Sequence, residues 1–233
     1  MPAPRCCDAG WPRSSIERVF DEPGVLPVAA PLTDALPRGG LSRGSVVSVL
    51  GQGATSLLFT LLVGPAGATG RWAALVGMPG LGLRAAAELG VDLDRVAVIP
   101  DPGPDVLQVV SILIDGVDLI AVALPSSARP TPSRQRVLAG RLRQRGAVLL
   151  VAGPWPGADL VLTGRWAGWH GLGRGHGRLR DRELVVQVGG RRAAGRGCTV
   201  ELLLRANRDA VRVVPAVPAA VPAVIPAAVA RVS

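Results

Sequence analysis

The sequence predicts an α/β protein: an αβα sandwich on a mostly parallel sheet, with antiparallel strands added at its C-terminal edge. Strand and helix signals alternate from residue 46 to residue 152, which is typical of a parallel sheet covered by helices on both faces. Several strand signals, such as Val46–Leu50, are apolar at every position or nearly so, which indicates burial on both faces. Beyond Pro156 the strand signals have no helix between them, which predicts antiparallel strands.

The first half of the sheet is predicted from short apolar runs bounded by turn residues. The helices between them are apolar stretches that end at Gly or Gly-Pro, because Gly supplies the left-handed conformation that commonly terminates a helix. In chain order these elements are strand Val46–Leu50, helix Ala54–Val63, strand Trp72–Val76, helix Arg84–Leu89 and strand Val96–Ile99.

The second half follows the same alternation. The clearest helix start is Thr131-Pro132, an N-cap residue followed by proline in the first turn. That helix is expected to turn Val137, Leu138 and Leu142 inward. In chain order the elements are helix Pro104–Ile114, strand Val117–Leu124, the helix from Thr131 to about Gln144, and strand Ala147–Ala152.

Three further strands are predicted at Leu160–Thr163, Glu183–Val188 and Thr199–Leu204, joined by Gly/Arg-rich turns. The chain is then divided into a flexible N-terminal segment (1–30), a core (31–212) and a Pro/Ala/Val-rich tail (213–233). The N-terminal segment carries a short helix signal at Ser15–Phe20. Prolines recur through the tail, so it is expected to be extended and polyproline-like.

All 26 basic residues are arginine, and the formal net charge is +9. A chain without lysine has neither a Schiff-base lysine nor a phosphate-binding lysine. The positive balance permits a nucleic-acid or acidic protein partner, although arginine is also common on solvated faces. The N-terminus lacks the apolar region of a signal peptide, and prolines interrupt the uncharged tail, so we expect a cytoplasmic protein with no membrane partner.

The first strand-to-helix turn is where phosphate-binding proteins cradle their ligand with backbone N–H groups. A working P-loop has four residues between its glycines, followed by Lys and Ser/Thr. Here one residue separates Gly51 from Gly53, and Ala54 stands where lysine would be. The turn therefore resembles a shortened, degenerate P-loop, with the sequence Gly51, Gln52, Gly53, Ala54, Thr55, Ser56.

Residues 36–62 and 88–95 together resemble the bacterial recombinase RecA. The resemblance lies in Gly39-Gly40-Leu41, the basic Arg43 before Gly44, the strand and turn that follow, and the Leu-Gly-Val-Asp segment at residues 89–92. It covers roughly residues 30–205 and implies a RecA-like fold. RecA-like chains also carry a Val-Asp strand that ends in a metal-coordinating aspartate, and Val117–Ala123 corresponds to it here.

The residues that the resemblance requires for ATP hydrolysis are replaced. The P-loop lysine is Ala54, the Walker B aspartate is Ala123, and no carboxylate follows the strand ending at Val76 until Glu88. Phosphoryl transfer depends on cations and metal ions that stabilise the transferring group. We therefore expect no enzymatic activity and no cofactor. Only Gly153–Gly157 bridges the place where RecA has a long DNA-contacting loop.

A RecA-like chain with a broken ATP site and many arginines is similar to the ImuA-prime accessory proteins of the actinobacterial mutasome. That resemblance implies a non-catalytic adaptor in SOS-induced translesion DNA synthesis and mutagenesis. It implies an inactive Y-family polymerase homologue (ImuB-like) as partner, and adds the error-prone replicative-type polymerase and RecA as candidates. The alternative is a regulator without ATPase activity that binds DNA or modulates RecA filaments. DNA binding is expected to be weak and non-specific.

Arginines interleave with two tryptophans between residues 165 and 192. This composition suits stacking on single-stranded nucleic acid, and it suits a protein interface equally well, because Trp and Arg anchor binding hot spots. A second group of arginines along residues 134–145 is interpreted first as a solvated helix face. The candidate binding residues are Arg165, Trp166, Trp169, Arg174, Arg178, Arg180 and Arg182.

The histidines and cysteines are not expected to bind metal. His170 and His176 have no carboxylate or thiol between them, whereas a structural zinc site needs four ligands. Cys6 and Cys7 lie near the terminus, and Cys198 is expected to pack as a small apolar residue.

Overall fold

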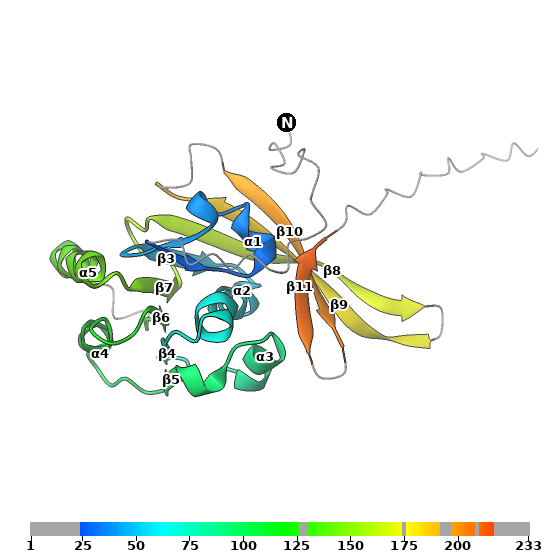
Figure 1. The fold of residues 1–233 in the computed structure, drawn as a ribbon, viewed down its shortest axis with the longest axis horizontal. Helices are drawn as coiled ribbons and strands as arrows, with labels where there is room; N and C mark the ends of the chain where they lie inside the picture. The colour runs from blue at the N-terminus through cyan, green and yellow to red at the C-terminus, as the bar shows by residue number, and fades with distance from the viewer. Residues whose placement is uncertain (1–23, 126–129, 174–175, 192–196, 208–209, 217–233) are drawn as a thin grey trace, which may run out of the picture.

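A nine-stranded sheet forms the centre of the protein in the computed structural model, which describes residues 24–125, 130–173, 176–191, 197–207 and 210–216 (Figure 1). Its strand order is β11-β10-β9-β8-β3-β7-β6-β4-β5. The parallel strands that the sequence predicted all form. They are β3 (Val46–Leu50), β4 (Ala73–Val76), β5 (Val96–Ile99), β6 (Leu119–Val122) and β7 (Val148–Ala152). The antiparallel prediction for Leu160–Thr163 was wrong on one side, because these residues of β8 pair in parallel with β3 and antiparallel only with β9.

Helices cover both faces of this parallel part, as predicted (Figure 1). The inner strands are buried on both sides: in β7, Leu150 packs with one core and Leu149 with the other. The edge strand β5, in contrast, is partly exposed. Within the described residues, no helix is both long and apolar enough to span a bilayer. Helices α2 (Ala54–Leu62) and α3 (Leu83–Glu88) contribute to the first core, and α4 (Val106–Leu113) and α5 (Pro132–Arg145) to the second.

Helix α5 shows how local sequence sets an element's ends. The Thr131 side chain accepts a hydrogen bond from the Arg134 N–H at 3.4 Å, and Gly146 ends the helix with a φ of 70°. Leu138 and Leu142 are buried as predicted, but Val137 is 65% exposed. The inward prediction for Val137 was wrong because only the stripe of residues four apart faces the sheet.

The antiparallel part is larger than the sequence predicted. The Gly/Arg-rich stretch after Thr163 was predicted to contain turns, but most of it is strand. Beyond Thr163, β8 no longer pairs with β3, and its far end projects with β9 past the helical part of the molecule (Figure 1). We call this projection the β8–β9 arm, residues 165–173 and 176–183. The strands are β8 (Leu160–Gly173), β9 (His176–Gly189), β10 (Cys198–Ala206) and β11 (Val211–Pro215).

The structured core extends past both predicted boundaries. Strand β1 (Val25–Pro27) pairs with β2 (Gly40–Ser42), and Leu26 is fully buried, so the part of segment 1–30 that the structure describes belongs to the core. Helix α1 (Ala30–Thr33) follows it. At the other end β11 runs across the boundary predicted at residue 213. The predicted helix at Ser15–Phe20 and the tail from residue 217 lie outside the described residues.

Candidate functional site

The turn between β3 and α2, where a phosphate cradle would lie, is filled by the backbone of β8. The Gly53 N–H donates to the Gly164 carbonyl oxygen at 3.1 Å, and the Ala54 N–H donates to the Gly51 carbonyl oxygen at 3.1 Å. A Cβ on Gly51 would collide with the Gly164 carbonyl, and one on Gly53 with the Leu184 side chain. Gly51 also has a φ of 91°, so glycine is required here for conformation and for space.

The hydrogen bonds at this turn take up N–H groups that a bound phosphate would need. Anion binding at a helix N-terminus needs N–H groups that face the ligand, and here two N–H groups of the turn are bonded within the protein. The opposite wall is the β8 backbone, which offers a carbonyl oxygen where an anion needs a donor. The turn is therefore a packing contact between β3 and β8.

The other two replaced residues lie at the same edge of the sheet, because β3, β4 and β6 are parallel. Ala123 directly follows β6, and its N–H donates to the Val76 carbonyl oxygen at 3.0 Å. Glu88, the first carboxylate after β4, lies on α3 and pairs with Arg84 at 3.0 Å, one helical turn earlier. Among the described residues, no carboxylate directly follows β3, β4 or β6.

A cavity of about 630 Å³ opens beside this edge, between the ends of β3 and β7 and the start of α5. None of the described residues that line it is charged. The Ser48 hydroxyl donates to the Gly153 carbonyl oxygen at 3.0 Å and accepts from the Trp155 N–H at 2.9 Å. The Gln135 amide donates to the Pro130 carbonyl oxygen at 3.2 Å. The polar side chains of Ser48 and Gln135 thus serve the local fold, and the described lining offers no carboxylate, histidine or thiol for acid–base chemistry.

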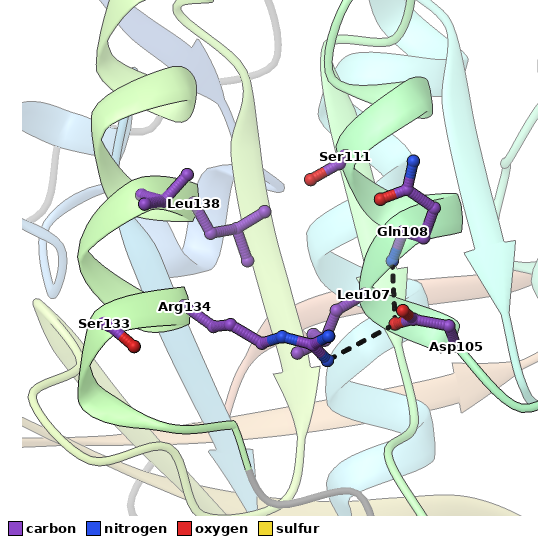
Figure 2. Close-up of a pocket in the computed structure, with 8 residues that line it drawn as sticks. Asp105, Leu107, Gln108, Ser111, Ser133, Arg134 and Leu138 are labelled. Atoms are coloured by element: carbon purple, nitrogen blue, oxygen red, sulfur yellow. Dashed lines mark hydrogen bonds and ion pairs between the residues drawn. The ribbon is translucent and has the colours of Figure 1, made fainter.

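A smaller pocket of about 260 Å³ lies between α4 and α5 (Figure 2). Asp105 caps α4 through the Gln108 N–H at 3.3 Å, and the Arg134 guanidinium lies 3.7 Å from its carboxylate. Both side chains are more than half exposed, so their attraction is screened by water. Arg141 and Arg145 each pair with Asp115 further along the helix. These contacts support the interpretation of the arginines of α5 as a solvated face.

The β8–β9 arm brings together three of the predicted binding residues. The guanidinium carbon of Arg182 lies 5.2 Å from the ring centre of Trp166 and 5.1 Å from that of Trp169. The two ring centres are 6.3 Å apart, with planes tilted by 34°. Distances of this size are typical of cation–π contacts. We call these three side chains the Trp–Arg cluster.

A β-bulge makes the cluster possible. Residues three apart on a regular strand point to opposite faces, so Trp166 and Trp169 would be separated. The pairing with β9 slips by one residue between Trp166 and Gly168, so that Trp166 lies opposite Leu184 and Trp169 opposite Arg182. Leu184 and Arg182 are two apart on β9 and share a face. The bulge therefore turns both tryptophans to the same side as Arg182.

The remaining candidates do not join the cluster. Arg165 lies opposite Val185 in the sheet and so on the other face, and Arg180 is exposed further out on the arm. The side chain of Arg178 and the whole of Arg174 lie outside the described residues.

The structure also gives the positions of both histidines and of Cys198. His170 shares a hydrogen bond of 2.9 Å with the Glu183 carboxylate, and His176 is exposed near the end of the arm. Among the described residues no three His, Cys, Asp or Glu side chains gather where they could hold a metal ion. Cys198 is buried in the first core, as predicted. Cys6 and Cys7 lie outside the described residues.

Comparison with known proteins places the chain in a family. The MT3502 N-terminal domain family matches residues 34–157, which include β3 through β7. The uncharacterized protein Rv3395c of Mycobacterium tuberculosis is 44% identical over 138 residues, or 58% of this chain. The aligned segment spans 66% of that relative's length, slightly under two thirds. The chain therefore belongs to the MT3502 N-terminal domain family.

Proposed function

We propose that the protein is a non-catalytic RecA-like adaptor that binds an inactive Y-family polymerase homologue (ImuB-like) in SOS-induced translesion synthesis. The fold agrees with the RecA resemblance in two respects. The centre of the sheet is parallel with helices on both faces, and antiparallel strands are added at its C-terminal edge. The chain keeps this scaffold while the residues for ATP hydrolysis are replaced.

The observation that carries the proposal is the filled turn between β3 and α2. A RecA-like enzyme holds its nucleotide at this turn, and here the Gly164 carbonyl of β8 occupies the N–H of Gly53. A missing lysine alone leaves a weakened site, whereas here the N–H groups of Gly53 and Ala54 are also bonded within the protein and a carbonyl oxygen faces the turn. Without a nucleotide cycle, the remaining way for such a scaffold to act is to bind other macromolecules.

The partner is assigned from the ImuA-prime resemblance, and the surface of the arm is consistent with it. The Trp–Arg cluster combines the residue types most enriched in binding hot spots. It stands on a projection that no described helix covers, so a second protein can reach it (Figure 1).

Sedimentation velocity of the full chain with the ImuB-like protein of its host tests the proposal. We expect a stable complex whose dissociation constant is unchanged by Mg-ATP, because the chain has no nucleotide cycle to couple to binding. Absence of a complex at micromolar concentrations would refute the adaptor role. A complex that forms only with nucleotide would refute the non-catalytic part.

A further inference from the structure

The Trp–Arg cluster carries a cation that the described residues leave without a counter-ion. Its neighbours on β9 are both acidic, but alternation along the strand turns them to the opposite face. There Glu183 contacts His170 at 2.9 Å, and Asp181 pairs with Arg205 at 3.4 Å. No carboxylate among the described residues forms an ion pair with Arg182, so its contacts are the two tryptophan rings.

The rings hold Arg182 in one orientation. Trp166 packs against the first hydrophobic core, which fixes the base of the cluster to the sheet. A guanidinium lying over two rings loses little further freedom when it binds a ligand, and the edges of its plane remain able to donate hydrogen bonds. Such an arrangement is suited to a carboxylate, which accepts two parallel N–H bonds from the guanidinium.

One aromatic ring of the cluster is largely exposed. Trp169, whose ring lies 5.1 Å from the guanidinium carbon of Arg182, is 53% exposed. An exposed apolar group of this kind, next to a held charge, marks an interaction surface.

The chemistry favours a protein ligand over single-stranded nucleic acid. Platforms for single strands offer successive open ring faces for bases, with cations along the backbone path. In this cluster the guanidinium already lies against both rings, so neither ring offers an open face on that side. Arg165, which could contact a phosphate, lies on the other face of the sheet.

We propose that the Trp–Arg cluster is the binding site for a carboxylate of a partner protein, presented on an acidic segment with apolar neighbours. The carboxylate pairs with Arg182, and the apolar neighbours cover the exposed ring of Trp169. The inference deepens the proposed function, since it supplies the contact that the adaptor would use. It also predicts that the partner contributes an Asp or Glu that is buried on binding.

Selection from a phage-displayed library of random dodecapeptides tests this chemistry without requiring the partner. The full chain is compared with Arg182→Gln, which removes the charge, and with Arg212→Gln, which makes the same change at an exposed arginine of β11. We expect the wild type and Arg212→Gln to enrich peptides that combine Asp or Glu with large apolar residues. Synthetic copies of these peptides should bind Arg182→Gln about tenfold more weakly or worse.

Three outcomes would overturn the inference. They are enriched peptides without an acidic residue, equal enrichment on Arg182→Gln, and no enrichment on any variant. Loss of binding to a fluorescent oligothymidine in Arg182→Gln alone would assign the cluster to nucleic acid instead. Equal melting temperatures of the variants establish that all are folded.

The two proposals can fail separately. If the ImuB-like complex forms and Arg182→Gln leaves it unchanged, the inference about the cluster fails and the adaptor proposal stands. If no complex forms but acidic peptides are enriched, the adaptor proposal fails and the inference stands.

Discussion

Gly51→Ala is expected to destabilise the protein by about 3 kcal/mol, because the new Cβ would meet the Gly164 carbonyl and the backbone would be held at a positive φ. On the usual scale for a chain of this size, the melting temperature would fall by about 6–12 °C. Gly53→Ala is expected to act in the same direction, since its Cβ would meet the Leu184 side chain. The measurement is a thermal melt followed by circular dichroism.

Gly80→Ala is the matched control. Gly80 has no atom within 4 Å of an added Cβ, and its φ is not positive. Its melting temperature should therefore stay within about 2 °C of the wild type. If Gly51→Ala had the same melting temperature as Gly80→Ala, the turn would not be closely packed on β8. The conclusion that β8 fills the turn would then be wrong.

Truncation after Asn207 is expected to lower the melting temperature by about 5–10 °C and to cause aggregation, because it removes β11. Val211 and Val213 of this strand pack against the first core, and the strand covers the edge of β10. An uncovered strand edge is a template for pairing between molecules. Differential scanning calorimetry combined with light scattering measures both effects.

Truncation after Ala216 is the control for the same experiment. It keeps β11 and the hydrogen bond from the Ala216 N–H to the Glu201 carbonyl oxygen at 2.8 Å. The tail beyond this residue is predicted to be dispensable for folding, so the melting temperature should stay close to that of the full chain. A large decrease would show that the tail packs on the core, and an unaffected Asn207 truncation would exclude β11 from the stable sheet.

The parallel half of the fold was predictable because its signals are local. Strand β3 is almost entirely apolar and is followed by Gly51. The start of α5 is recognisable from Thr131 at the N-cap and Pro132 in the first turn. These features depend on neighbours in sequence and need no knowledge of the pairing.

The β8–β9 arm was not predictable in the same way. Glycine is a strong turn signal, so Gly164, Gly168 and Gly171 pointed to turns, whereas in the structure they lie within β8. Gly164 is needed for the close approach of the turn after β3. One pairing shift lies between Trp166 and Gly168, and another lies between His170 and Leu172, where Gly171 stands. Glycine within a strand often marks a bulge or a close approach, and that would have been the usable signal.

The candidate site was predictable in composition and not in geometry. The residue types of the Trp–Arg cluster stood out in the sequence, but simple alternation would have put Trp166 and Trp169 on opposite faces. Only the bulge brings both rings to Arg182. The closure of the turn after β3 was also invisible, because Gly53 and Gly164 are far apart in sequence and meet only when β8 pairs with β3.

If the turn after β3 is closed to nucleotide, as we propose, Mg-ATP will not change the melting temperature of the protein. A ligand at a hundred times its dissociation constant adds about 2.7 kcal/mol of stability, which would raise the melting temperature by about 5–10 °C. We predict no shift for the wild type, and none for Ala54→Lys, because a restored lysine does not free the N–H of Gly53 from Gly164. A saturable, concentration-dependent increase in the melting temperature of the wild type would contradict the account.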